Sequence, residues 1–351
     1  MGSLRGCEGY YAAIYDADAM NLRWLLSVLL ILILCFALPV NAHVPVSADG
    51  NTGIDAALAI EKPIKSYVIY GHLHEAGEVS WYQLRMNPGD RFVVSLLTPG
   101  YNASIPDLIV LSPGTVLPSE GLPPGISVPQ GYRAEIIKGE LPHSAEYEPF
   151  SPAAVFEAAS YSKEITTPGL WYLAVVSPAN ETRYSLATGY VEEFTPSEWV
   201  FVPINVLSTH IWEGQSILAL LSPFLAVVIL GFIVISRREK RKGPTLTYSC
   251  WLAAIAGLCY LGGAAVTVVQ MVRAMAVTGP ASSVALTLVF VIVPVVLGIW
   301  ALRMGRTSSE WTIRDRVFLV LIAILGLVFW AGLVVGPVLA IAAAVIPGRA
   351  K

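Results

Sequence analysis

Residues 216–242 read SILALLSPFLAVVILGFIVIS followed by RREKRK, and this stretch decides the fold. Its apolar part carries no charge and has the roughly 20 residues that a helix needs to cross a bilayer core. The basic run comes directly after it, and an excess of Lys and Arg beside a span marks the cytoplasmic side. The sequence therefore predicts that the chain before Ser216 is extracytoplasmic and that the chain after it belongs to the membrane.

Residues 216–351 are predicted to form a four-helix transmembrane bundle. The fourth apolar run is longer than one span needs, and Gly336 and Pro337 either kink it or split it so that the end turns back. The cores of the runs lack ionisable residues, which favours a packed anchor over a conduit. Because apolar residues also line some pores, a small conduit or a transporter accessory subunit is the alternative. The predicted spans lie near residues 216–236, 246–272, 283–302 and 317–346.

The composition divides the chain in the same way. Charged residues make up 13% of the sequence, whereas soluble domains carry roughly 25%. Residues 43–214 hold 19 acidic and 8 basic residues, a net charge of −11, and the rest of the chain has a net charge of +8. An acidic domain on the outside argues against a nucleic-acid partner. The lipid bilayer is the partner that the composition predicts.

The N-terminal region has the parts of a secretory signal. Residues 20–42 contain a basic residue at Arg23, an apolar run, and Val-Asn-Ala ending at Ala42 as a cleavage site. Residues 1–19 do not fit this pattern and are interpreted as an over-extended start. An uncleaved anchor is the alternative, and it gives the same topology.

Residues 43–192 have the pattern of an all-β domain. Short runs rich in Val, Ile, Tyr and Trp alternate with Gly, Pro and Asn clusters, and residues 87–90 (Asn-Pro-Gly-Asp) form a turn. The predicted fold class is an all-β extracytoplasmic sandwich or jelly roll followed by an α-helical transmembrane bundle. The clearest strands are expected at residues 66–72, 80–86, 91–97, 107–111, 132–137, 170–176 and 184–190.

Several segments of this domain resemble the bacterial pre-peptidase C-terminal (PPC) β-sandwich. The matching segments are the entry strand at residues 51–57, the strand-turn-strand core at 81–84 and 88–94, the central strand at 106–110, and the closing strands at 168–175 and 184–186. Pro106 replaces an acid of the family pattern. The layout also resembles archaeal surface membrane proteins of the methanogen type, a resemblance that implies a cell-surface location and brings no activity.

Two segments of this part fall outside the strand pattern. Residues 193–215 predict a collar helix with Thr195 as N-cap, Pro196 at the first helical position and Glu198 closing a capping box. This helix lies either on the outer leaflet or beneath the sandwich. The Pro-rich insertion at residues 112–152 is interpreted as a surface loop, with a lid over a sheet edge or a partner surface as alternatives.

Three histidines give the sharpest chemical hypothesis. Cleavage after Ala42 leaves His43 as the N-terminal residue, which binds metal through its amine and its ring. His72 and His74 alternate along a strand and so point to one face. Together they predict a copper site, since imidazole suits copper; the alternative is a frayed terminus and two surface histidines. No other cofactor is expected. Asn102 and Asn180 lie in glycosylation sequons.

The function expected from these features is non-enzymatic. The sequence contains no nucleophile-elbow, zincin, Walker A or dinucleotide-binding motif. We therefore expect a multi-pass protein of the cell membrane that presents a binding or structural module of the cell envelope to a protein or glycan partner. The copper-binding module and the conduit are the alternatives.

Overall fold

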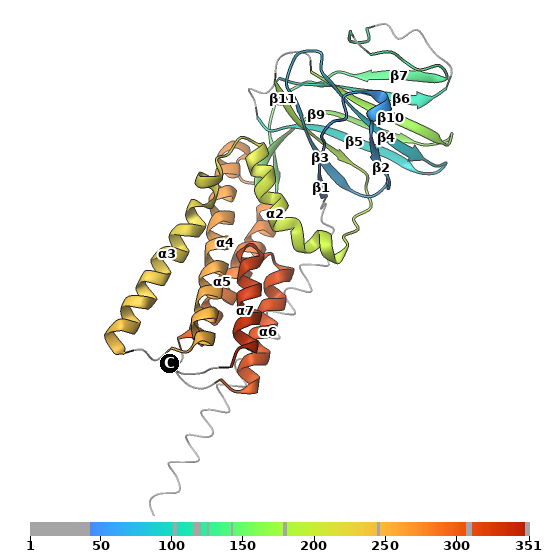
Figure 1. The fold of residues 1–351 in the computed structure, drawn as a ribbon. Coiled ribbons are helices and arrows are strands. Elements are labelled where there is room, and N and C mark those ends of the chain that lie inside the picture. Colours follow the sequence, from blue (N-terminus) through green and yellow to red (C-terminus); the bar gives the residue numbers. More distant parts are fainter. Residues whose placement is uncertain are drawn as a thin grey trace, which may run out of the picture. The chain divides into compact units, whose positions relative to one another are not determined.

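The structure is a computed structural model that describes residues 43–100, 104–114, 121–124, 126–141, 143–177, 181–243, 246–306 and 311–347. The predicted start segment 1–19, the predicted signal peptide 20–42 and both sequon asparagines, Asn102 and Asn180, lie outside these residues. Ala42–Lys351 forms one compact unit. Within it, an all-β region precedes the helices, as the predicted fold class requires (Figure 1).

Eleven strands form two sheets among the described residues. The six-stranded sheet has the order β1-β3-β11-β5-β9-β8 and the five-stranded sheet the order β2-β4-β10-β6-β7. A short 3-10 helix, η1 (Ile54–Ala56), lies between β1 and β2. The strands are β1 (Val44–Ser47), β2 (Leu58–Ile60), β3 (Tyr67–Leu73), β4 (Val79–Met86), β5 (Arg91–Thr98), β6 (Asp107–Pro113), β7 (Tyr132–Ile137), β8 (Glu146–Glu148), β9 (Ala153–Glu164), β10 (Gly169–Val176) and β11 (Thr182–Thr188).

The seven strands expected from the sequence are all present, and their ends differ from the prediction by no more than two residues. Four strands, β1, β2, β8 and β9, were not predicted. The interpretation of residues 112–152 as a surface loop is wrong for Glu146–Glu148, which pairs antiparallel with β9. The same insertion supplies β7, the edge strand of the five-stranded sheet. The insertion therefore adds an edge strand to each sheet.

The core of the sandwich lies between the two sheets. Residues alternate along each strand, so that Ile69 and Leu73 of β3 point inward with Gly71 between them. At its centre, the hydroxyl groups of Tyr82 and Tyr184 are hydrogen-bonded at 2.6 Å. A Cβ atom at Gly71 would come within 2.3 Å of the Tyr184 ring, so this position has room only for glycine.

Six α-helices follow the sandwich in the described residues. Three of them, α3, α4 and α5, are long and apolar enough to cross a membrane. The helices are α2 (Pro196–Trp212), α3 (Ile217–Lys242), α4 (Tyr248–Thr278), α5 (Val284–Gly305), α6 (Ile313–Val328) and α7 (Val335–Val345), with the 3-10 helix η2 (Ala331–Val334) between the last two.

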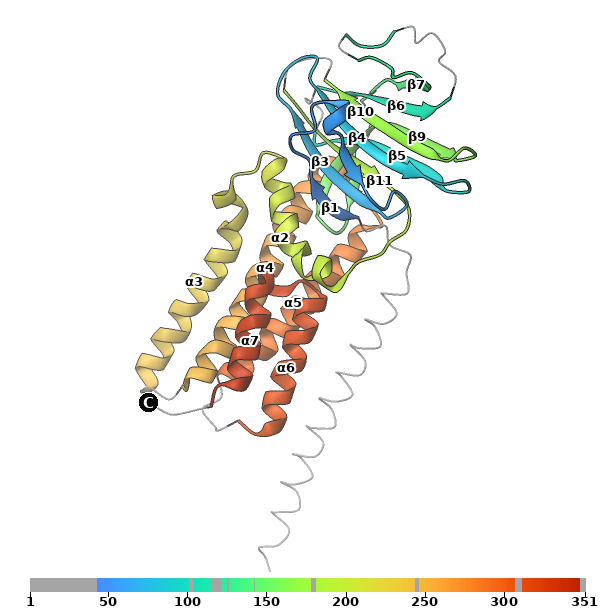
Figure 2. The ribbon, with the colours of Figure 1, turned by 45° about the vertical axis from the view of Figure 1, so that its right-hand side comes forward.

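The fourth predicted span is two helices, so the alternative in which the end turns back is confirmed. The break precedes Gly336 and Pro337, which lie inside α7. The Arg316 guanidinium near the start of α6 donates to the carbonyls of Ala344 (2.6 Å) and Ile346 (3.0 Å) at the end of α7. The two helices therefore form an antiparallel hairpin (Figure 2). At its tip, Trp330, Leu333 and Val334 have φ between 53° and 68°, which is strained for residues with side chains.

Small residues let the helices approach closely. A Cβ atom at Gly257 of α4 would lie 2.7 Å from the carbonyl oxygen of Gly298 in α5, and one at Gly263 would lie 2.9 Å from the backbone nitrogen of Gly332 in η2. Backbones this close maximise dispersion contact between helices. The helices therefore pack around α4 as a dense bundle.

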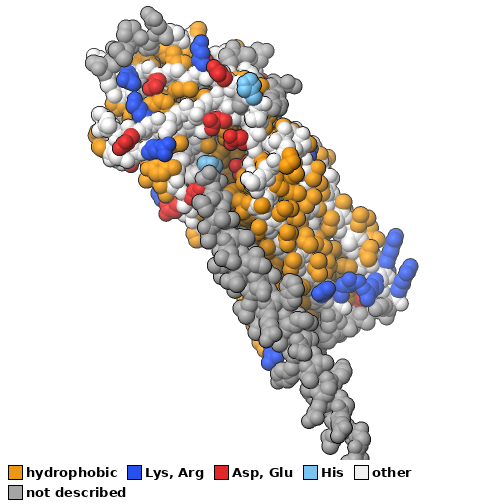
Figure 3. Space-filling model, turned by 180° about the vertical axis from the view of Figure 1, so that it is seen from behind, with side chains coloured by type: hydrophobic (Ala, Val, Ile, Leu, Met, Phe, Trp, Pro, Cys, Tyr) orange, Lys and Arg blue, Asp and Glu red, His pale blue; other side chains and the backbone are white. Residues whose placement is uncertain are grey.

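The surface of the helices is apolar along its length and basic at one end. Figure 3 shows hydrophobic side chains over the helices and Lys and Arg side chains at the end away from the sandwich. In α3 the exposed residues include Leu218 (75% exposed) and Leu230 (63% exposed). Such a surface is typical of helices that lie in contact with lipid.

Gly71→Ala tests the core of the sandwich. The added methyl group must displace the Tyr184 ring and break its hydrogen bond to Tyr82, so we expect a loss of about 1–3 kcal/mol of stability, as for other overpacked cores. Thermal unfolding followed by circular dichroism measures it. Gly53→Ala is the matched control, because a Cβ atom there meets nothing within 4 Å. Equal melting temperatures for the two variants would contradict this account of the core.

Candidate functional site

Helix α2 begins as the sequence predicts. The Glu198 amide donates to Thr195 Oγ1 (3.2 Å), and the Thr195 amide donates to Glu198 Oε2 (2.7 Å), which together make a capping box. Glu198 also accepts two hydrogen bonds from the buried Lys65 ammonium, at 2.8 and 2.9 Å. Burial raises the pKa of Glu198, but the bonds from Lys65 and Thr195 outweigh it and lower the pKa overall. The carboxylate therefore stays ionised at neutral pH.

Helix α2 is attached to the sandwich at both of its ends. Glu198 in the first turn pairs with Lys65 just before β3, and the Trp212 indole in the last turn donates to the Gly71 carbonyl in β3 (3.0 Å). The six residues from Lys65 to Gly71 span about 20 Å as a strand, and the fourteen from Glu198 to Trp212 span about 21 Å as a helix. The matched lengths hold α2 alongside β3.

Of the two alternatives for the collar helix, these contacts favour the one in which α2 packs beneath the sandwich, and its place relative to the outer leaflet stays a prediction. Its other face still exposes apolar side chains, including Phe201 at 54% and Ile204 at 44%.

The face of β3 that points away from the sandwich core is turned toward α2. Tyr70 pairs in register with Ser185 of β11, and Ser185 pairs with Leu97 of β5, so these three residues form a row across the six-stranded sheet. The Tyr70 ring packs edge-on against Trp212, with centroids 4.9 Å apart. This row is one wall of a cavity.

Strand β8 and the turn after it provide another wall. The Tyr147 and Thr287 hydroxyls lie 2.9 Å apart, and Thr287 donates to the Pro149 carbonyl (2.8 Å). Thr287 is in α5, so both neighbours of Glu148 are fixed to the helical bundle. Because side chains alternate along a strand, Glu148 points the opposite way from Tyr147, into the cavity.

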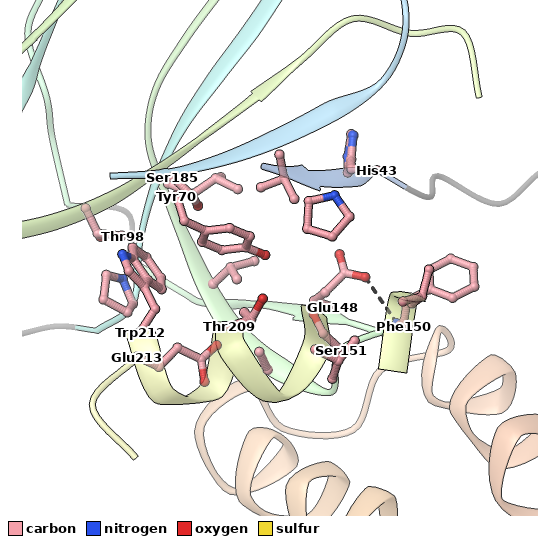
Figure 4. A pocket seen from close by; sticks show the side chains of 18 of the residues that line it. His43, Tyr70, Thr98, Glu148, Phe150, Ser151, Ser185, Thr209, Trp212 and Glu213 are labelled. Atoms are coloured by element: carbon pink, nitrogen blue, oxygen red, sulfur yellow. Dashed lines mark hydrogen bonds between the residues drawn. The ribbon is translucent and has the colours of Figure 1, made fainter. Parts of the chain in front are cut away.

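These walls enclose a cavity of about 110 Å³, which we call the junction cavity (Figure 4). It lies between the six-stranded sheet, α2, the β8–β9 turn and the tip of the α6–α7 hairpin. It shares Pro45, Tyr70, Thr209 and Trp212 with a groove of about 230 Å³ beside β1 and α2. The residues that line it include His43, Tyr70, Thr98, Glu148, Phe150, Ser151, Phe194, Thr209, Trp212, Glu213 and Trp330.

Glu148 is the unusual group of this cavity. Burial raises its pKa to about 7, although a hydrogen bond from the Phe150 amide (3.1 Å) acts in the opposite direction. The described lining residues include a second carboxylate, Glu213, but no Lys or Arg. Glu213 Oε2 lies 2.9 Å from Nδ1 of the buried His210. Glu148 therefore lacks a cationic partner among the described residues that line the cavity.

Two further titratable groups face the cavity. Burial lowers the pKa of His43, whose Nδ1 is hydrogen-bonded to the Ser66 hydroxyl. The imidazole is therefore neutral at pH 7. Burial also raises the pKa of Tyr70, and a hydrogen bond to Thr209 opposes the shift. The phenol thus stays protonated at neutral pH.

The structure brings together two of the three predicted copper ligands. The His72 and His74 rings are 4.3 Å apart, and each has a carboxylate neighbour: His72 pairs with Glu181 at 2.9 Å and His74 lies 3.5 Å from Glu78. His43 is bonded to Ser66, six residues before His72, which is about 20 Å along an extended strand. No group of three or more His, Cys, Asp or Glu arranged for a metal occurs in the described residues. Copper binding itself stays a prediction.

The comparisons with known proteins add no relative. The chain matches no protein-family model, and no curated protein is similar to it. The resemblance to the PPC sandwich and to archaeal surface proteins therefore stays a prediction from motifs.

Sequence analysis did not identify Glu148, Tyr70 or Thr209 as site residues. Tyr70 and Thr209 belong to elements that were predicted, but nothing in their local pattern marks a cavity. Glu148 lies in the insertion interpreted as a loop. The alternation Glu146-Tyr147-Glu148 before Pro149 has the period of a strand and was the available indication.

Glu148→Gln tests the raised pKa of this carboxyl group, because the difference in stability between variant and wild type should depend on pH. An acid with a pKa of about 7 when folded and 4.5 when unfolded lowers stability as the pH rises from about 4.5 to 7, and the loss persists above pH 7. We expect the variant to melt about 4–8 °C above the wild type at pH 8, corresponding to about 2 kcal/mol in a domain of this size. At pH 4.5 the difference should vanish.

The measurement is thermal unfolding of both proteins between pH 4.5 and 8. Because His43, Tyr70 and Glu213 are the same in both, the difference isolates Glu148. Glu146→Gln, an exposed change in the same strand, should follow the wild type at every pH. A constant difference between wild type and Glu148→Gln would contradict the raised pKa.

Proposed function

We propose that this protein is a multi-pass protein of the cell membrane whose sandwich lies on the extracytoplasmic side and acts as a non-enzymatic binding module of the cell envelope. The junction cavity is its binding site. The observation that carries this proposal is the half-buried carboxyl group of Glu148, which faces a cavity between the sandwich and the helices that no described Lys or Arg lines.

The distribution of basic residues supports the orientation. Arg237 and Arg238 lie near the end of α3, Arg303 and Arg306 at the end of α5, and Arg316 near the start of α6. These helix ends are remote from the sandwich (Figure 1). An excess of Lys and Arg in short loops marks the cytoplasmic side, so the sandwich is assigned to the opposite side.

The cost of burying Glu148 supports a binding role. A carboxyl group in a poorly solvated cavity destabilises the folded state whenever it is ionised. Strongly shifted ionisable groups that also line a cavity are concentrated at functional sites. A hydrophobic residue at position 148 would fill this space at lower cost, so the carboxylate is best explained by a ligand that meets it.

The helical bundle supports an anchoring role. The backbone contact between Gly257 and Gly298 leaves no space between α4 and α5 at that level. A dense bundle around α4 holds α5 and the α6–α7 hairpin against the sandwich and thereby fixes two walls of the cavity. The membrane part is accordingly proposed as a rigid support for the binding site.

Cysteine labelling tests the orientation. We expect a membrane-impermeant maleimide to label Ser160→Cys, on an exposed position of β9, in intact cells. Arg238→Cys, at the basic end of α3, should react only after the membrane is permeabilised. Labelling of the unsubstituted protein measures the contribution of its own cysteines. The reverse pattern would place the sandwich in the cytoplasm and contradict the proposal.

A cavity-filling variant tests the binding site. Thermal-shift screening of the full-length protein against amines, carboxylates, sugars and short peptides should find at least one compound that raises the melting temperature. Ser151→Tyr, which places a ring in the cavity, should abolish this stabilisation because the ligand and the ring compete for the same volume. Ser160→Tyr, an exposed change, should retain it. Stabilisation that is equal in both variants would show that the ligand binds elsewhere.

A further inference from the structure

We propose that the junction cavity binds a small organic ammonium group, held by the Glu148 carboxylate and by the aromatic side chains around it. This inference rests on the proposed function and names the chemical class of its ligand.

The charge of the cavity selects a cation. Glu148 and Glu213 are the ionisable acids that face it, and no Lys or Arg is among the described residues that line it. Glu213 is engaged with His210 at 2.9 Å and with Gln215 at 3.3 Å, whereas Glu148 receives a single bond from the Phe150 amide. A cation beside Glu148 gains charge-assisted bonding in a poorly solvated site, whereas an anion there would be repelled.

The aromatic lining selects an organic cation. Five aromatic residues line the cavity, and they come from four separate parts of the chain. Cations such as substituted ammonium groups are attracted to the faces of aromatic rings, with energies of about 2 kcal/mol or more when the site is desolvated. The five are Tyr70, Phe150, Phe194, Trp212 and Trp330.

These aromatic side chains are held in place before any ligand binds. Trp330 stacks on Phe290 of α5 with centroids 4.7 Å apart, and its indole donates to the Trp199 carbonyl (3.1 Å). Trp212 is fixed by its bond to Gly71. Fixed ring positions reduce the ordering cost of binding, as expected for a pre-formed site.

The volume and the remaining polar groups limit the ligand to a few heavy atoms. A cavity of about 150 Å³ admits benzene. The junction cavity of about 110 Å³ shares four lining residues with the groove of about 230 Å³ beside β1 and α2, so the two together take an ammonium group with a short substituent. The Thr98 hydroxyl is buried and has no hydrogen-bond partner among the described residues. It lies on the side of the cavity away from Glu148 (Figure 4). A ligand with a hydroxyl or amine beyond its ammonium group can bind the Glu148 carboxylate with one end and the Thr98 hydroxyl with the other.

A metal ion fits these residues less well. Calcium takes six to eight oxygen ligands, and copper is bound by imidazole or sulfur. The described residues contain no group of three or more acidic, His or Cys side chains arranged for a metal. One available carboxylate among aromatic rings suits a weakly hydrated organic cation.

Choline is the probe that tests this inference. Its uncharged isostere, 3,3-dimethyl-1-butanol, has the same shape and hydroxyl group but no charge. The full-length protein in phosphatidylglycerol nanodiscs is titrated with each compound at pH 8, and tryptophan fluorescence is followed because Trp212 and Trp330 line the cavity. We expect choline to bind at least tenfold more tightly than the isostere.

Two variants assign the binding to Glu148. Glu148→Gln should weaken choline binding at least tenfold and leave the isostere unaffected, whereas Glu146→Gln should change neither. Choline that binds no better than the isostere, or equally well to Glu148→Gln, overturns the inference. If choline does not bind but another compound from the thermal-shift screen binds, and Ser151→Tyr abolishes that binding, the ammonium inference fails and the proposed function stands. If no compound binds in this way, both the inference and the proposed function fail.

The pH and the lipid composition provide independent readouts. Since ionised Glu148 is required, choline should bind several-fold more weakly at pH 6 than at pH 8. The other titratable groups that face the cavity are His43, Tyr70 and Glu213. Nanodiscs of phosphatidylcholine distinguish a lipid headgroup from a free ligand: a headgroup in the cavity competes with added choline, whereas a site for free ligands gives equal affinity in both lipids. An affinity for choline that does not change between pH 6 and pH 8 would contradict the role of Glu148.

Discussion

The attachment of α2 along β3 is the constraint on which the rest of the structure depends. Lys65 is almost fully buried, and its ammonium group lies 2.8 Å from the Glu198 carboxylate. Removing one partner of such a pair leaves an uncompensated charge, which costs far more than the pair contributes. The same carboxylate closes the capping box that begins the helix. One side chain therefore fixes where α2 starts and which strand it follows.

This constraint also determines the chemistry of the cavity. With α2 held at both ends, Thr209 and Trp212 are kept in contact with Tyr70, and the three side chains form a fixed wall of the cavity. On the other side, the two contacts of Thr287 hold the residues that flank Glu148. The carboxyl group is thus kept in a poorly solvated position by contacts that do not involve its own oxygens. The pKa of Glu148 is therefore raised by desolvation, which these contacts impose, and not by a neighbouring charge.

The sequence predicted features that depend on local pattern. The capping box at Thr195, the seven strong strands and the apolar runs are set by spacing and composition within a few residues. It did not predict β1, β2 and β8, which are three or four residues long, or β9, whose apolar residues alternate less regularly. The sequence did not predict the junction cavity, because residues 70, 148 and 209 come together only in the folded structure. His43 was expected near His72, but the parallel pairing of β1 with β3 brings it to Ser66 instead.

The walls of the junction cavity come from segments far apart in the chain, from His43 before β1 to Trp330 at the tip of the helical hairpin. That tip holds three residues with side chains in left-handed conformations. The Trp199 indole donates to the Val328 carbonyl and the Trp330 indole donates to the Trp199 carbonyl, and these two bonds help to keep the tip in place. The sandwich and the helical bundle are therefore not interchangeable modules. A sandwich joined to a different anchor would lose part of its cavity wall, and this anchor without α2 would lose the contacts that hold its tip. In evolution, the two parts can change only in step with one another.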